Sequence, residues 1–238
     1  MAYNQSRMRW GRLIGTTCVV ALCVVGGAAG AASPSAVVSS AISAMRAQHS
    51  YHYVATQLGT AASPAQVTMV GDANRTTGIQ RIRYAKGSSV GNVTVIVVAN
   101  TAYIRGDAFA LTNYMSFPPA SAAAAADKWL ELPHTASGFA PVAADVRLDA
   151  SALQELKMPA PLQSLGQSVV RGQHVTGVRA TVHSGSQTGI ETLYARSSDH
   201  LPVEQQFTQG GKSVGGVVYS NWGETVHIAA PVPVLVLR

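Results

Sequence analysis

One short string in the sequence has the pattern of a serine hydrolase. Residues 211 to 215, Gly-Lys-Ser-Val-Gly, match the G-x-S-x-G motif, whose serine must sit on a sharp turn between a strand and a helix. Here both flanks have a strand pattern, so Ser213 falls on a hairpin instead. A hydrolase would also need His200 or His227 and an acid such as Glu224 beside this serine. The motif therefore supports a serine hydrolase only weakly, and we expect no catalytic residue.

The histidines do not form a metal-binding pattern. His49 and His52 are close enough to share a metal ion, but a zinc site needs further ligands, and no acidic or cysteine cluster lies near them in sequence. The other five histidines are scattered singly. We therefore expect no metal and no cofactor. The tripeptide Arg105-Gly106-Asp107 occurs in some cell-adhesion ligands, but so short a match arises by chance, and a turn is the simpler interpretation.

Two arginines are candidates for contact with lipid headgroups. Arg81 and Arg83 point to one face of a predicted strand, whereas Ile82 and Tyr84 point to the other, because side chains alternate along a strand. This pattern is typical of a solvated face over a core face. The alternative is a basic rim that meets anionic headgroups.

Apolar residues from several segments are candidates for the wall of a cavity. Segments 109–115 and 127–132 are rich in aromatic and aliphatic residues, and Val95 and Val97 share one face of a strand that is apolar on both sides. Core packing explains such residues, and so does a helical layer over an apolar cavity. The candidates for the cavity wall are Ile82, Val95, Val97, Tyr103, Leu111, Tyr114, Met115 and Trp129.

The first 32 residues have the features of an export signal. A basic stretch with Arg7, Arg9 and Arg12 precedes an apolar run at 13–25, and a small-residue cleavage pattern follows at 29–31. Cleavage would leave one domain at 33–238 that works in the periplasm, in the cell envelope or outside the cell. The alternatives are an uncleaved anchor, since 13–32 is about long enough to span a bilayer, or a lipid anchor on Cys18 or Cys23.

The composition after the signal suits an envelope protein with a large core. Both cysteines lie in the signal, so the mature chain uses neither disulfides nor thiolate ligands. Removing the three signal arginines leaves 14 basic residues against 11 acidic ones, in place of a whole-chain net charge of +6. This mild charge favours solubility and does not indicate nucleic-acid binding.

The mature chain is predicted to begin with a helix and to continue mainly as strands. Ser33 suits an N-cap and Pro34 the first helical position, and the helix should end near Gln48. Strands are expected at 51–57, 67–72, 79–84, 93–98 and 102–105, and again at 168–171, 174–183, 190–196, 203–208, 214–221 and 225–228.

Between these two runs of strands, helices are expected at 109–115, 120–132 and 151–157, and Gly210-Gly211 favours a hairpin in the second run. The order lacks βαβ alternation. It therefore predicts an α+β fold in which a large curved antiparallel sheet, a half-open barrel, has helices covering its concave face.

Five segments together resemble the LppX/LprG lipoprotein family of actinobacterial envelopes, which is related in fold to the periplasmic carriers LolA and LolB. The segments lie at 48–53, 101–106, 127–132, 193–196 and 201–204, where the chain has QHSYHY, TAYIRG, DKWLEL, LYAR and LPVE. Their spacing covers most of the mature chain. Many members carry a lipid anchor, and this chain lacks a convincing site for one.

The resemblance implies a LolA-like half-barrel whose concave side holds acyl chains of a lipid, glycolipid or lipidated protein, without catalysis. We therefore expect an exported, monomeric lipid-binding or carrier protein that meets membrane surfaces transiently and binds no nucleic acid. The alternative is an envelope sensor or protein-interaction module that uses the same half-barrel and binds a protein through a groove or a sheet edge.

Overall fold

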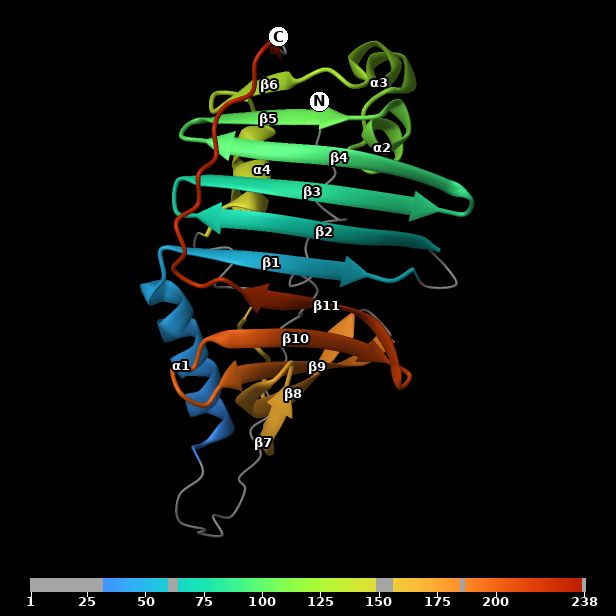
Figure 1. Cartoon of the computed structure of the whole chain (residues 1–238). Helices are drawn as coiled ribbons and strands as arrows, with labels where there is room; N and C mark the ends of the chain where they lie inside the picture. The colour runs from blue at the N-terminus through green and yellow to red at the C-terminus, as the bar shows by residue number, and fades with distance from the viewer. Residues whose placement is uncertain (1–31, 60–63, 149–155, 185–186, 237–238) are drawn as a thin grey trace.

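The computed structural model describes residues 32–59, 64–148, 156–184 and 187–236, which form one twelve-stranded sheet accompanied by four helices (Figure 1). The predicted export signal at 1–32 lies almost wholly outside the described residues, and so does most of the predicted helix at 151–157. Within the described ranges, none of the helices combines the length and the hydropathy needed to span a bilayer.

The first helix begins and ends where the sequence predicts. In α1 (Pro34–Ala47), the hydroxyl of Ser33 accepts a hydrogen bond from the amide of Ala36 at 3.2 Å, and Gln48 is the C-cap. The first run of strands follows as five antiparallel neighbours: β1 (Ser50–Gln57), β2 (Ala65–Asn74), β3 (Thr77–Lys86), β4 (Ser89–Val98) and β5 (Thr101–Gly106).

The second run of strands joins the first in the same sheet. It consists of β7 (Leu162–Val170), β8 (Gln173–Ser184), β9 (Gln187–Arg196), β10 (Pro202–Gln209) and β11 (Lys212–Ser220). β11 pairs with β1, so the strand order is β12-β6-β5-β4-β3-β2-β1-β11-β10-β9-β8-β7. All pairs are antiparallel except that of β12 (Leu235–Val236) with β6 (Leu130–Pro133). The predicted α+β class and the large open antiparallel sheet are confirmed.

Two sequence predictions about the short elements are wrong, and one helix was not predicted. The helix expected at 120–132 stops early: α3 covers Pro119–Ala125, Asp127 adopts a left-handed φ of 59°, and the following residues pair with β5 as β6. A helix that was not expected, α4 (Phe139–Val146), follows. Residues 225–228 are not a strand, because they cross the sheet without joining its ladder.

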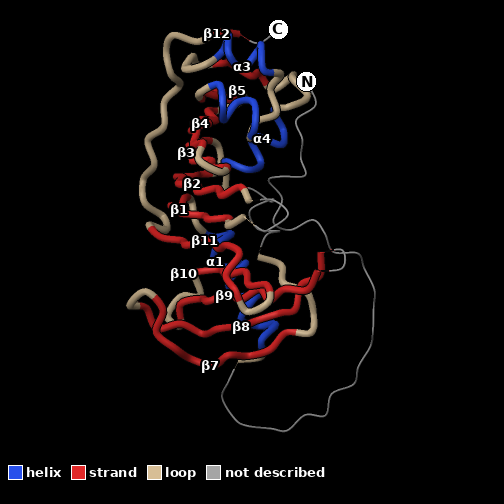
Figure 2. Tube along the Cα trace, turned by 90° about the vertical axis from the view of Figure 1, so that its right-hand side faces the viewer, coloured by secondary structure: helices blue, strands red, loops and turns tan. Residues whose placement is uncertain are grey.

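Helices and the C-terminal segment lie on opposite sides of the sheet. In Figure 2, α3 and α4 stand on one side, while a long loop that leads to β12 runs along the other. We call the helix-covered side the inner face and the other side the outer face. The helix between β5 and α3, α2 (Ala108–Asn113), also packs on the inner face, against β4.

Candidate ligand-binding face

The inner face carries two apolar clusters. In the first cluster, inward side chains of β2 to β6 pack against α2, α3 and α4. In the second cluster, α1 lies against β7, β8 and β9, and inward side chains of β1, β2 and β11 complete the cluster. Met69 of β2 is partly buried and contacts both clusters. The sheet therefore presents a nearly continuous apolar surface to its helices.

The structure brings six of the eight predicted cavity residues together. Ile82, Val95, Val97, Leu111, Tyr114 and Met115 are all buried members of the first cluster. Tyr103 lies on the opposite side of β5 from the buried Ala102 and Ile104, and Trp129 is a partly buried residue outside the cluster. Burial and the nearby charge of Asp145 raise the pKa of the Tyr114 phenol, so its hydroxyl stays neutral.

Packing on the inner face is tight at one end and looser in the middle. A Cβ atom on Gly78, the register partner of Val97, would lie 1.9 Å from the carbonyl oxygen of Val146 in α4. The helix backbone therefore rests directly on the sheet there. By contrast, Met69, Phe207 and Val217 point inward from β2, β10 and β11 and are only partly buried by the described residues. These three mark the part of the inner face that the described helices cover least.

A row of polar side chains crosses the inner face from β3 to β9, and we call it the polar belt. The amide of Gln80 donates a hydrogen bond to the hydroxyl of Tyr53 at 2.8 Å. On β11, which pairs with β1, the hydroxyl of Tyr219 donates to the amide oxygen of Gln205 on β10 at 3.1 Å. The amide nitrogen of Gln205 donates in turn to Glu191 on β9 at 2.5 Å. The belt gives an otherwise apolar face a fixed set of hydrogen-bonding groups.

Glu191 is the carboxylic acid of the belt. Its side chain is 5% exposed, and burial raises its pKa to about 7, although the hydrogen bond from Gln205 acts in the opposite direction. A carboxyl group with this pKa is partly protonated at neutral pH. Its apolar surroundings therefore reduce the charge that the belt carries at neutral pH.

Sequence reasoning did not single out the belt residues, although a signal for them exists. Gln80 has the same phase along β3 as the buried Ile82 and Tyr84, and opposite to the exposed Arg81 and Arg83. Glu191 likewise has the same phase along β9 as the buried Leu193. A polar residue at the apolar phase of a strand indicates an inward-facing polar group.

The two arginines proposed as a headgroup rim lie on the outer face. Arg81 lines a pocket of about 340 Å³ between β1 to β4 and the C-terminal segment, together with the hydrogen-bonded pair of His52 and Asp72 (2.7 Å). Ile96 also faces this pocket and is only 7% exposed, although it lies outside the inner clusters. The C-terminal segment thus covers part of the outer face.

The residues of the serine hydrolase alternative do not converge. Ser213 lines a second outer-face pocket of about 390 Å³ over β1, β10 and β11, whereas His227 and Glu224 line the pocket beneath the C-terminal segment. His200 lies in the turn before β10 with a left-handed φ of 64°. The motif around Ser213 is therefore a hairpin feature: Gly210 and Gly211 form its turn, both with positive φ.

Other sequence candidates have structural roles. The carboxylate of Asp107 accepts hydrogen bonds from the amides of Ala110 (2.8 Å) and Asn92 (2.5 Å), so it caps α2 and fixes it to β4. Arg105-Gly106-Asp107 is the predicted connection from strand to helix. In the part of the chain that the structure describes, no three His, Cys, Asp or Glu side chains gather as metal ligands.

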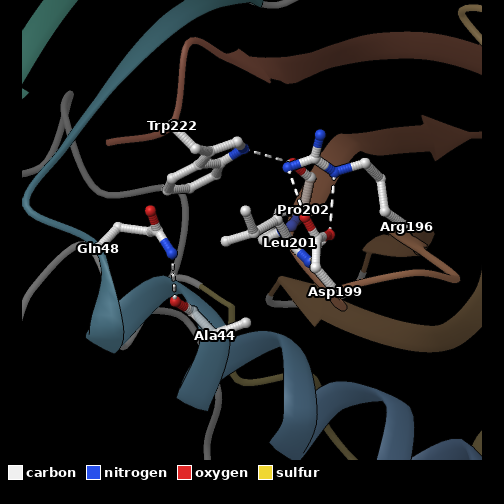
Figure 3. A network of polar contacts seen from close by, with 7 residues as sticks. All are labelled: Ala44, Gln48, Arg196, Asp199, Leu201, Pro202 and Trp222. Carbon is white, nitrogen blue, oxygen red and sulfur yellow. Dashed lines mark hydrogen bonds and ion pairs between the residues drawn. The ribbon is translucent and has the colours of Figure 1, made fainter. Parts of the chain in front are cut away.

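Two segments that carry the family resemblance, 193–196 and 201–204, lie at the end of β9 and the start of β10, on either side of the turn that joins these strands (Figure 3). Arg196 pairs with Asp199 at 2.9 Å, and Asp199 accepts a hydrogen bond from the amide of Leu201 at 3.2 Å. The indole nitrogen of Trp222 donates to the carbonyl of Pro202 at 3.1 Å. These residues thus hold the start of the C-terminal segment against the sheet.

The fold is similar to two solved mycobacterial structures. LprF from Mycobacterium bovis matches with a TM-score of 0.59 and 14% identity over 83% of this chain and 96% of its own. The Mycobacterium tuberculosis lipoprotein LppX matches with a TM-score of 0.50 and 14% identity over 83% of this chain and 100% of its own. No protein-family model matches the sequence, and no curated protein matches it significantly. The chain therefore has the fold of LprF and of the lipoprotein LppX, and the resemblance found in the sequence is confirmed at the level of the fold.

Proposed function

We propose that the protein is an exported, non-catalytic carrier that holds acyl chains of a lipid, glycolipid or lipidated protein against the inner face of its sheet. The observation that carries this proposal is the apolar inner face beneath four helices, on a fold that the chain shares with the lipoprotein LppX. The cavity candidates Ile82, Val95, Val97, Leu111, Tyr114 and Met115 belong to this face.

The energetics of such a site require no charged partner. Burying one methylene group contributes about 0.8 kcal/mol, so a chain of about sixteen carbons contributes on the order of 12 kcal/mol before the cost of association. Apolar surface alone therefore suffices for tight binding. Polar groups such as those of the belt would then decide which lipid binds.

The remaining parts of the proposal concern location and organisation. Residues 1–32 act as an export signal, and 33–238 act as one carrier domain that binds neither metal nor nucleic acid and works as a monomer. Arg81 and Arg83, which are exposed on the outer face, would meet anionic headgroups when the protein touches a membrane. The resemblance to the LppX/LprG family supports an envelope location.

Filling the loosely covered part of the inner face tests the proposal. Met69 lies inward on β2 and contacts both clusters, whereas its neighbour Val70 lies on the outer side of the same strand. We expect Met69→Trp to weaken binding of a fluorescent acyl probe by more than tenfold, or about 1.4 kcal/mol, because the indole would occupy the ligand's space. Val70→Trp should leave the affinity within about twofold, which is about 0.4 kcal/mol.

Thermal unfolding of both variants provides the control for folding. Equal affinities of the wild type and a folded Met69→Trp variant would contradict binding at this face. A wild type that binds no acyl probe would contradict the carrier function itself and would favour the sensor or protein-interaction module.

A further inference from the structure

One amide on the inner face has an unusual surrounding. Gln80 is 4% exposed, and its side chain reaches the hydroxyl of Tyr53 across β2, where Gly71 stands between them in register. A Cβ atom on Gly71 would lie 2.4 Å from the Tyr53 ring. The glycine therefore leaves the space through which the tyrosine meets the amide, and Gln80 is held in one place.

Only one of the two polar atoms of this amide is satisfied. The nitrogen of Gln80 bonds to Tyr53, and the amide oxygen has no hydrogen-bond partner among the described residues. Exchanging the nitrogen and oxygen positions would leave the nitrogen unpaired instead, since the hydroxyl can donate or accept. Buried polar atoms are almost always paired, so an unpaired one calls for a partner, which an ordered water or a group of a bound ligand can supply. A hydroxyl group satisfies either orientation.

The neighbours of Gln80 define the chemistry of that group. Along β3 the inward neighbours are Gly78 and Ile82, and across the sheet they are Gly71 and Val95. None of the four is charged, so a carboxylate or phosphate would lose its hydration without gaining a cation there. Among these strand neighbours, an uncharged group therefore fits better than an anion.

The position of Gln80 also places this group along the ligand. Ile82 and Val95 belong to the first cluster, whereas Tyr53 belongs to the second. A group that bonds to Gln80 therefore has apolar side chains on both sides. This placement fits a hydroxyl partway along an acyl chain better than a headgroup at its end.

We propose that Gln80 is a specificity residue, which recognises an uncharged hydroxyl group partway along an acyl chain bound on the inner face. The proposal rests on the proposed carrier function and names the ligand class of that site. A site built to bond a hydroxyl discriminates against an analogue that lacks it, because the polar group of the protein is then left buried and unpaired.

Methyl ricinoleate and methyl oleate are matched probes, because they share chain length and double bond and differ by one mid-chain hydroxyl. We expect the wild type to bind methyl ricinoleate at least about tenfold more tightly than methyl oleate. Gln80→Leu should bring this ratio close to unity while methyl oleate still binds. Gln66→Leu, a change at an exposed position of β2, should keep the wild-type ratio.

Tyr53→Phe provides a second variant, since it removes the hydroxyl that holds the amide and should also lower the ratio. A wild type that binds both esters equally would overturn the proposal and leave the carrier function standing. A folded Gln80→Leu variant that keeps the wild-type ratio would overturn it as well. If neither ester binds, the carrier function fails, and the role of Gln80 fails with it.

Discussion

At the scale of single residues, Glu191 is the group whose ionisation should be visible in the stability of the protein. Folding raises the pKa of this carboxyl from 4.5 to about 7, mainly through burial. Between these two values the folded state binds more protons than the unfolded state, so the free energy of unfolding decreases as pH rises. We expect the contribution of Glu191 to be fully present below about pH 4.5 and lost by about pH 7.5, with a total of up to about 3 kcal/mol.

Urea unfolding of the wild type and of Glu191→Gln across this pH range measures the effect. The glutamine retains the size of the side chain and cannot ionise, so the difference in stability between the two proteins should change in favour of the variant as pH rises. A difference that stays constant from pH 4.5 to pH 7.5 would show that the carboxyl titrates normally in the folded protein.

At the scale of elements, Trp222 connects the C-terminal segment to the two halves of the sheet. Its ring stacks on Tyr51 (5.4 Å between centroids) and on Tyr219 (5.8 Å), and its nitrogen bonds to Pro202. We expect Trp222→Ala to lower the free energy of unfolding by about 2 kcal/mol, since the stacked and partly buried ring is lost. Trp222→Phe keeps an aromatic ring but loses the hydrogen bond of the indole nitrogen. The loss of this hydrogen bond alone should lower the free energy of unfolding by about 1 kcal/mol.

Chemical denaturation measures both variants, and hydrogen exchange on β11 and β12 shows where the effect acts. An alanine variant as stable as the wild type would mean that the C-terminal segment is not attached through this ring.

The elements also show where sequence patterns suffice and where they do not. Alternation and glycine turns predicted β1 to β5 and β8 to β11 because each strand has an apolar inward phase. The alanine-rich run at 120–126 favours a helix by propensity, but pairing with β5 draws Leu130–Pro133 into the sheet edge, and tertiary pairing outweighs propensity there. α4 begins after Gly138 and has no capping side chain, so its start lacks the N-cap signal by which a helix is recognised in a sequence.

At the scale of the whole molecule, the candidate site was only partly predictable. Phase along β3 and β4 placed Ile82, Val95 and Val97 on the inner face, since that phase is a local property of each strand. The polar belt depends instead on the register of Gln80, Gly71, Tyr53 and Tyr219 across four strands. Such pairing between distant segments cannot be read from local alternation.

The proposed carrier function depends on acyl lipid that occupies the inner face of this sheet. Mass spectrometry of organic extracts from the protein purified out of its native host tests it most directly. We expect acyl lipid in an amount close to that of the protein, and much less from Met69→Trp prepared in the same way. Extracts of well-folded wild type with no more acyl lipid than a mock purification would contradict it.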